Sequence, residues 1–244
     1  MAAGGESPAH RALKQLALFW AQREGYRACA FEVMPPRCRF RADLAAYKPG
    51  PHQRAAVGPD LGTTAIFECK QARSDFLIDS RSAAATQKKL AVLQIRRETL
   101  ERLLGVHYPS LRRGDSLFPD FDSPDLSRLE HANYRRVLGQ MTVLQRRLYR
   151  HVKFETIVRY LCANLFYFVV EPDIVDPAEV PVGWGLLVRR GRALELVQRP
   201  TIQPCRPADR LVLLQRIAAI GTRALSVLHE ISSEEVWAAR RRGA

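Results

Sequence analysis

The stretch that decides the fold runs from Thr63 to Phe76 and reads TTAIFECKQARSDF. Its apolar first half ends in Glu68, Cys69 and Lys70 and follows a turn rich in Gly and Pro, which predicts a β-strand up to Lys70. Alternate side chains of a strand share a face, so Glu68 and Lys70 point the same way, about 6.6 Å apart along the strand. Cys69 points to the other face. A carboxylate and an ammonium group side by side at a strand end form an arrangement that catalysis can use.

Composition narrows the class of protein. The 244 residues suffice for one large domain, and a hydrophobic content of 47% is typical of a globular protein. We expect no segment as long as a membrane span and no apolar core of a signal peptide at the N-terminus, which predicts a soluble cytoplasmic protein with no membrane partner. The five cysteines show neither a C-x-x-C pair nor the spacing of a zinc site, so we expect reduced thiols, mostly in the core.

Charge points to a class of partner. The net charge is +13 and the pI is about 10.1, which favours a polyanion, with DNA as the first candidate. Arg greatly outnumbers Lys and Ala is abundant, so genomic base composition is an alternative source of this charge. Charge alone therefore indicates a nucleic-acid partner without excluding a basic structural protein that binds none.

Periodicity and turn residues predict one α/β domain over residues 1–244, with a mixed central sheet flanked by helices. Cap signals at Ser7-Pro8 and Ser123-Pro124 each predict the start of a helix. A helical insertion over about 83–150 is set into this domain. The predicted helices cover 8–24, 74–104, 123–161, 207–231 and 232–242, and the predicted strands cover 26–33, 38–47, 63–70, 164–171, 184–189 and 194–198.

The second and third predicted strands can pair as an antiparallel hairpin, which places the start of one beside the end of the other. Asp43 and Glu68 then meet at one rim, with Lys70 beside them. Carboxylate oxygens suit Mg²⁺ or Mn²⁺, and the backbone carbonyl of Cys69 is a third candidate ligand. Lys70 would orient or deprotonate a water molecule, or stabilise charge on a phosphate. The alternative is a surface ion pair at a strand end.

A second aspartate, Asp60, completes a literal "PD…ExK" text with Glu68. Eight residues of strand would separate the two carboxylates by roughly 20–26 Å, too far to share one metal ion. We therefore interpret Asp60 as a turn residue.

Four segments resemble the PD-(D/E)xK nuclease superfamily, and within it the MmcB-type DNA-repair nuclease-like proteins. They are Arg41-Ala42-Asp43, IFECKQARSDFLIDSR (66–81), RYLCANLFYFVVEP (159–172) and VPVGWGLLVRRGRALELV (180–197). The resemblance implies a restriction-endonuclease-like fold and a Mg-dependent deoxyribonuclease that acts in DNA repair or processing. It implies that Asp43, Glu68 and Lys70 are catalytic, and many nucleases of this kind work as homodimers to cut both strands.

The compact relatives lack the insertion over about 83–150, which carries many basic residues. It is either a DNA-clamping or partner-binding hairpin or a solvated, salt-bridged helical face. His10 and Glu32 are accessory candidates near the metal rim, with a structural histidine and a surface glutamate as the alternatives. A nuclease fold that binds nucleic acid or docks a partner without cleavage is the alternative function. The predicted contacts to DNA are Arg41, Arg73, Arg81, Lys88, Lys89 and Lys153.

Overall fold

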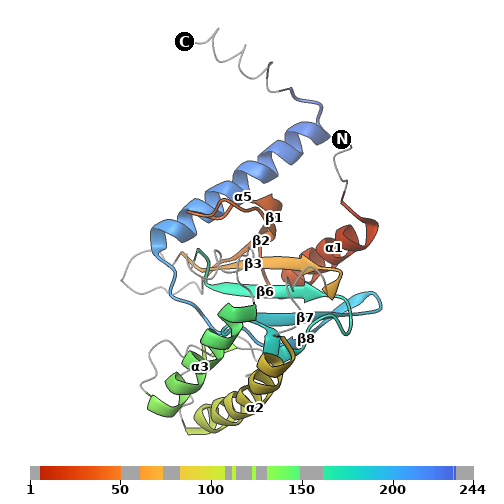
Figure 1. Cartoon of the computed structure of the whole chain (residues 1–244). Helices are drawn as coiled ribbons and strands as arrows, with labels where there is room; N and C mark the ends of the chain where they lie inside the picture. Colours follow the sequence, from red (N-terminus) through yellow and green to blue (C-terminus); the bar gives the residue numbers. More distant parts are fainter. Residues whose placement is uncertain are drawn as a thin grey trace, which may run out of the picture.

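A mixed six-stranded sheet in the order β1-β2-β3-β6-β7-β8 forms the centre of the computed structural model (Figure 1). The pairs β1–β2, β2–β3 and β7–β8 are antiparallel, whereas β3–β6 and β6–β7 are parallel. The structure describes residues 6–50, 61–73, 83–107, 112–113, 123–124, 131–148, 162–232 and 234. The strands are β1 (Ala28–Val33), β2 (Ala42–Lys48), β3 (Thr63–Lys70), β6 (Leu165–Val170), β7 (Gly185–Arg190) and β8 (Ala193–Gln198).

One helix covers each face of the sheet. Helix α1 (Pro8–Arg23) begins after Ser7, whose hydroxyl accepts a hydrogen bond from the His10 N–H at 3.1 Å. It packs on the face that carries Phe67 of β3. Helix α5 (Pro207–Leu228) packs on the opposite face, which carries Ile66. Because neighbouring residues of β3 point to opposite faces, the strand is buried on both sides.

The predicted helical insertion is present as a pair of helices beyond β8 (Figure 1). Helix α2 (Ala83–His107) packs against α3 (Ala132–Leu148) and against the short 3₁₀ helix η4 (Pro177–Glu179). The Gln94 side-chain amide of α2 donates to the side chain of Gln198 on β8 at 3.1 Å. Between α2 and α3 lies a two-residue ladder of β4 (Arg112–Arg113) with β5 (Ser123–Pro124).

Several sequence-based boundaries are corrected. Ser123-Pro124 forms β5 and not a helix start, and α3 begins at Ala132. The cap-then-proline pattern starts a helix at Ser7-Pro8 because an amphipathic segment follows it at once and packs on the sheet. The second strand begins at Ala42, so 38–41 lies outside it. The helix predicted to start at Ser74 is described only from Ala83. Residues 149–161 and most of 232–242 lie outside the described residues.

All five cysteines are free, as predicted, and three of them are buried. Helix α5 departs from another expectation. By length and composition alone it could cross a membrane, so the prediction that no segment has that length is wrong for Pro207–Leu228. Its first half packs on the sheet through Leu213 and Ile217, whereas Val227 and Leu228 near its end are exposed.

Candidate functional site

The predicted hairpin brings Asp43 to the end of β3. The ladder between β2 and β3 pairs Leu44 with Phe67, and one further step places Asp43 opposite Glu68. At that step the Asp43 carboxylate continues the ladder, because its Oδ2 accepts a hydrogen bond from the Cys69 backbone N–H at 2.6 Å. This hydrogen bond ties the Asp43 carboxylate to the backbone at the end of β3. The predicted partnership of Asp43 with the E-C-K segment is therefore present.

Glu68 and Lys70 occupy the last steps of β3. Glu68 is fully buried, and Lys70 at the strand end is half-buried. Directly opposite residues of antiparallel strands have Cβ atoms about 5 Å apart, so the side chains of Asp43 and Glu68 start from neighbouring positions. A buried carboxylate within an apolar strand departs from the usual burial pattern, and such departures are frequent at functional sites.

Cys69 contributes its backbone N–H and carbonyl to the rim, and not its thiol. In an antiparallel ladder the N–H and C=O of one residue face the same neighbouring strand, so the Cys69 carbonyl faces the Asp43 edge of β3. Burial raises the pKa of the Cys69 thiol well above its usual value, and the nearby carboxylates of Asp43 and Glu68 raise it further. The thiol therefore stays protonated and packs among the core residues beneath α1.

The first turn of α1 approaches the Asp43 carboxylate. His10 Nε2 lies 3.5 Å from Asp43 Oδ1 and 3.8 Å from Glu6 Oε1. The hydroxyl of Ser7 donates to the side chain of Gln71, which directly follows Lys70. These contacts hold the N-terminus of α1 at the end of β3, where the helix dipole favours a negative charge. His10 thus lies beside the Asp43 carboxylate, and its accessory role remains a prediction.

Lys14 is a buried cation beneath this rim and lies outside the predicted site. Its Nζ lies 2.9 Å from Glu6 Oε1 and 2.7 Å from Glu32 Oε1. Burial alone would lower the pKa of Lys14, but the hydrogen bonds and charges of Glu32 and Glu6 outweigh it, and the pKa is raised. The pKa of Glu6 is lowered, mainly by its hydrogen bond to Lys14. Lys14 therefore stays charged and ties α1 to β1.

Glu32 adopts a backbone conformation that most residues avoid. Its φ of +54° lies in the left-handed region, and the β1–β2 ladder pairs Phe31 and Val33 but not Glu32. Such strain costs about 1–3 kcal/mol and is concentrated at functional sites. The salt bridge to Lys14 opposes this cost, so Glu32 is not a simple surface glutamate.

Metal binding at this rim would depend on few protein ligands. Within the described ranges, no group of three or more His, Cys, Asp and Glu side chains is arranged to hold a metal ion. The predicted set of Asp43, Glu68 and the Cys69 carbonyl has two side chains and one backbone oxygen, which matches the preference of Mg²⁺ for one or two carboxylates plus water.

The predicted DNA contacts lie in different surroundings. Arg41 is exposed next to Asp43, and Lys88 and Lys89 are exposed on α2. Arg73 is exposed but already has protein partners, because its guanidinium forms a two-pronged salt bridge to the buried Glu179, at 2.8 and 3.2 Å, and donates to the Ile174 carbonyl. Its contact with DNA remains a prediction. Arg81, Lys153 and the excluded Asp60 lie outside the described residues.

Two signals in the sequence could have identified Lys14 and Glu179. Lys14 stands in the helical stripe of His10, Ala17 and Ala21, where an apolar residue is expected. Glu179 is the last residue of D-P-A-E, a capping-box pattern with Asp176 as the N-cap. No short-range pattern shows that Arg73 reaches Glu179, since 106 positions separate them.

Comparison with known proteins adds little about function. No protein-family model matches the chain, and no curated protein matches it. The structure is similar to that of SPO1766, a protein of unknown function from Silicibacter pomeroyi. The TM-score is 0.49 and the sequences are 17% identical, with 92% of this chain and 94% of that chain covered. The sheet order and the flanking helices make the chain a mixed α/β protein.

Proposed function

We propose that this protein is a metal-dependent deoxyribonuclease of the PD-(D/E)xK type, with a restriction-endonuclease-like fold, that acts in DNA repair or processing. The observation that carries the proposal is the 2.6 Å hydrogen bond from the Cys69 N–H to Asp43. It joins two distant sequence segments into one rim that presents Asp43, Glu68 and Lys70. The six-stranded mixed sheet with flanking helices is compatible with this fold.

The donor set of the rim fits Mg²⁺ or Mn²⁺. Asp43 and Glu68 supply carboxylate oxygens from adjacent strands, and Cys69 supplies a carbonyl oxygen on the same strand edge. All three are hard oxygen ligands, and the only sulfur at this position is a protonated thiol. When bound, such an ion polarises a phosphodiester and activates water for its hydrolysis.

The protein's own residues would then hold and orient the reactants. Lys70 follows Glu68 on the same face, where its ammonium group orients the attacking water or stabilises negative charge on the phosphate. His10 contacts the Asp43 oxygen opposite the one that Cys69 binds, which fixes the orientation of that carboxylate. Lys14 positions α1, and with it His10, through Glu6 and Glu32.

DNA is the favoured substrate because the chain carries a net charge of +13. A basic protein attracts the phosphate backbone, and binding of this kind weakens steeply as salt increases. The exposed Arg41 next to Asp43 is a candidate phosphate contact at the rim. In this proposal, a homodimer would allow both strands of a duplex to be cut.

The test is cleavage by the purified full chain of single-stranded, duplex and branched DNA, with Mg²⁺, with Mn²⁺ and with a chelator. We expect metal-dependent cleavage that Glu68→Gln and Lys70→Met each reduce by at least about a hundredfold, since even residues behind a metal ligand are worth 10–100-fold. Glu195→Gln is the matched control, because Glu195 of β8 is an exposed carboxylate paired with Arg190 of β7. Cleavage that persists in the presence of the chelator would contradict the proposal. So would equal cleavage by the wild type and all three variants.

The second candidate is a nuclease fold that binds DNA without cutting it. The observation that favours it is the small number of side-chain ligands at the rim, because the described residues contain no three-group metal cluster. The same assay separates the two functions. Salt-dependent retention of DNA without cleavage in either metal would favour the binding module.

A further inference from the structure

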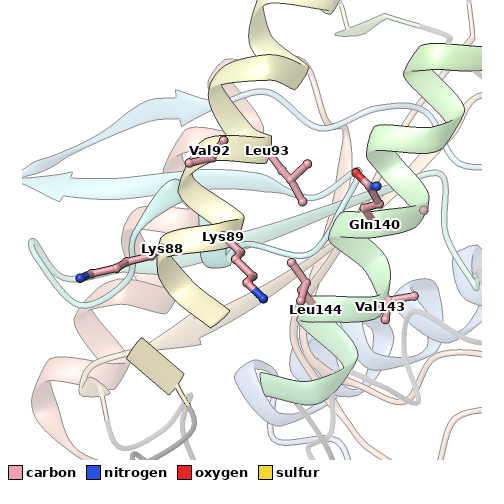
Figure 2. A pocket seen from close by; sticks show the side chains of 8 residues that line it. Lys88, Lys89, Val92, Leu93, Gln140, Val143 and Leu144 are labelled. Carbon is pink, nitrogen blue, oxygen red and sulfur yellow. The ribbon is translucent and has the colours of Figure 1, made fainter. Parts of the chain in front are cut away.

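The outer side of the helical insertion carries an apolar groove with a volume of about 730 Å³ between α2 and α3. Figure 2 shows it from close by, with Leu93 and Gln140 on facing helices and Lys89 directed toward Leu144. Next to this groove, Leu90 and Met141 pack with Ala178 of η4 in a buried cluster, and the groove residues Leu93 and Leu144 pack against that cluster. The apolar surface continues outward to the exposed Val92 and Val143.

The outward face exposes apolar side chains to a degree that a solvated helix pair does not need. Val92 is 68% exposed and Val143 is 52% exposed, and both line the groove. Contiguous exposed apolar surface of this kind marks an interaction site more often than scattered single residues do. The groove is thus a candidate for covering by another molecule.

Gly139 lies in the wall of the groove and supports this interpretation. It occupies the interior of α3, where Gly is unfavourable relative to Ala by roughly 0.5–1 kcal/mol. A Cβ built at this position meets no atom within 4 Å, so packing among the described residues does not require a glycine. A missing side chain lets the backbone of another helix approach closely.

The positive charge at the groove favours one chemical class of partner over others. Lys88 and Lys89 line one end, no acidic residue is among its lining residues, and neither lysine forms an ion pair within the described part of the chain. Lysines beside an apolar groove complement a ligand that is apolar on one side and acidic on the other. A nucleic-acid backbone would leave the exposed Val92 and Val143 without an apolar partner.

We infer that the groove between α2 and α3 docks an acidic amphipathic helix of a partner protein. Apolar side chains of that helix at i, i+3 or i+4, and i+7 would cover Val92, Leu93 and Val143. Its backbone would cross α3 at Gly139, and its acidic residues would meet Lys88 and Lys89. This role is independent of the carboxylate rim, and it assigns the insertion to partner binding.

The test uses a fluorescein-labelled amphipathic peptide of about 20 residues, long enough to form a helix, with leucines at the three spacings and glutamates beside them. Fluorescence anisotropy measures its binding to the full chain. A second peptide carries lysine at every glutamate position. Gly139→Trp fills the groove, and Gly221→Trp is its matched control, because Gly221 lies in α5 and a Cβ there also meets nothing within 4 Å.

We expect the acidic peptide to bind and the basic peptide to bind at least about tenfold more weakly. Lys88→Glu with Lys89→Glu should weaken the acidic peptide about tenfold, as expected from reversing two exposed charges. Gly139→Trp should abolish binding while Gly221→Trp leaves it unchanged.

Three results would overturn the inference. The first is the absence of binding by the acidic peptide at millimolar concentration, or equal binding by both peptides. The second is binding that survives Gly139→Trp. The third is a different occupant: a DNA duplex, or a second copy of the chain seen by sedimentation, whose association is lost in Gly139→Trp but not in Gly221→Trp.

Discussion

The carboxylate rim at the end of β3 and the groove between α2 and α3 break the usual rule of burial in opposite ways. At the rim, ionisable groups are buried: Glu68 is fully inside the protein and Lys14 is 8% exposed. In the groove, apolar groups are exposed, with Val92 at 68%. Both departures have a cost, since buried charges lose hydration and exposed apolar surface orders water.

This cost is offset by different means in the two regions. The rim is stabilised from within, because Asp43 binds the Cys69 N–H, and Lys14 binds two carboxylates. The groove is not stabilised from within, because Lys88 and Lys89 lack ion-pair partners among the described residues and Val92 is open to solvent. The difference indicates that the rim is organised before it meets a ligand, whereas the groove depends on another molecule to cover it.

The largest effect on stability is expected from Lys14→Met at the rim. The substitution leaves Glu6 and Glu32 without their common cation and should lower the free energy of unfolding by about 2–3 kcal/mol, less than for a fully buried pair because both carboxylates are partly exposed. Denaturant unfolding measures it. Arg23→Met is the control, because its salt bridge to Glu24, the C-cap of α1, lies at the surface and should be worth less than about 1 kcal/mol. Equal losses would show that the rim is not preorganised by Lys14.

The pH dependence of this difference follows from the two pKa shifts. The pKa of Lys14 is raised, so its contribution is complete below its ordinary value of 10.5 and is lost as pH rises through the higher folded value. The pKa of Glu6 is lowered, so its contribution is complete above 4.5 and is lost as pH falls. The stability gap between wild type and Lys14→Met should therefore be widest between these limits and shrink on either side.

An intermediate effect is expected from Arg73→Ala, which tests the connection between the two regions. Arg73 follows β3 and binds Glu179, which also accepts a hydrogen bond from Gln87 of α2. Removing the guanidinium leaves a buried carboxylate with fewer partners and should cost about 1–2 kcal/mol, discounted because Arg73 is 45% exposed. Hydrogen exchange should then increase in α2 more than in α1. An unchanged α2 together with weaker DNA binding would instead assign Arg73 to the substrate.

The smallest effect is expected from Gly139→Ala in the groove. The new methyl group meets no described atom, so the substitution should raise the free energy of unfolding by about 0.5–1 kcal/mol through helix propensity. Gly221→Ala should give a similar gain in α5. A loss of stability specific to Gly139→Ala would show that the position is packed, and the groove would then not be open to a partner.

Short-range patterns in the sequence predicted much of the carboxylate rim. The strand Thr63–Lys70 has the bounds that its apolar run indicates, and the start of one hairpin strand lies beside the end of the next, so Asp43 was expected next to Glu68. The contact of His10 with Asp43 was foreseen only as a candidate. Lys14 was missed because its role depends on Glu32, whose left-handed backbone cannot be inferred from neighbouring residues. Ser123-Pro124 was mistaken for a helix start because the same two residues also suit a short extended segment.

The sequence by itself determined the order of the six central strands and of α1, α2 and α5 around them, and the shared face of Glu68 and Lys70 at the end of β3. These follow from periods of 2 and 3.6 residues and from caps, which act over a few positions. Only the tertiary structure decided that β6 lies parallel to β3, that Arg73 reaches Glu179, and that α2 and α3 leave an apolar groove facing outward. Those features depend on packing between segments far apart in the chain, where many pairings satisfy the same local pattern and the buried surface selects one.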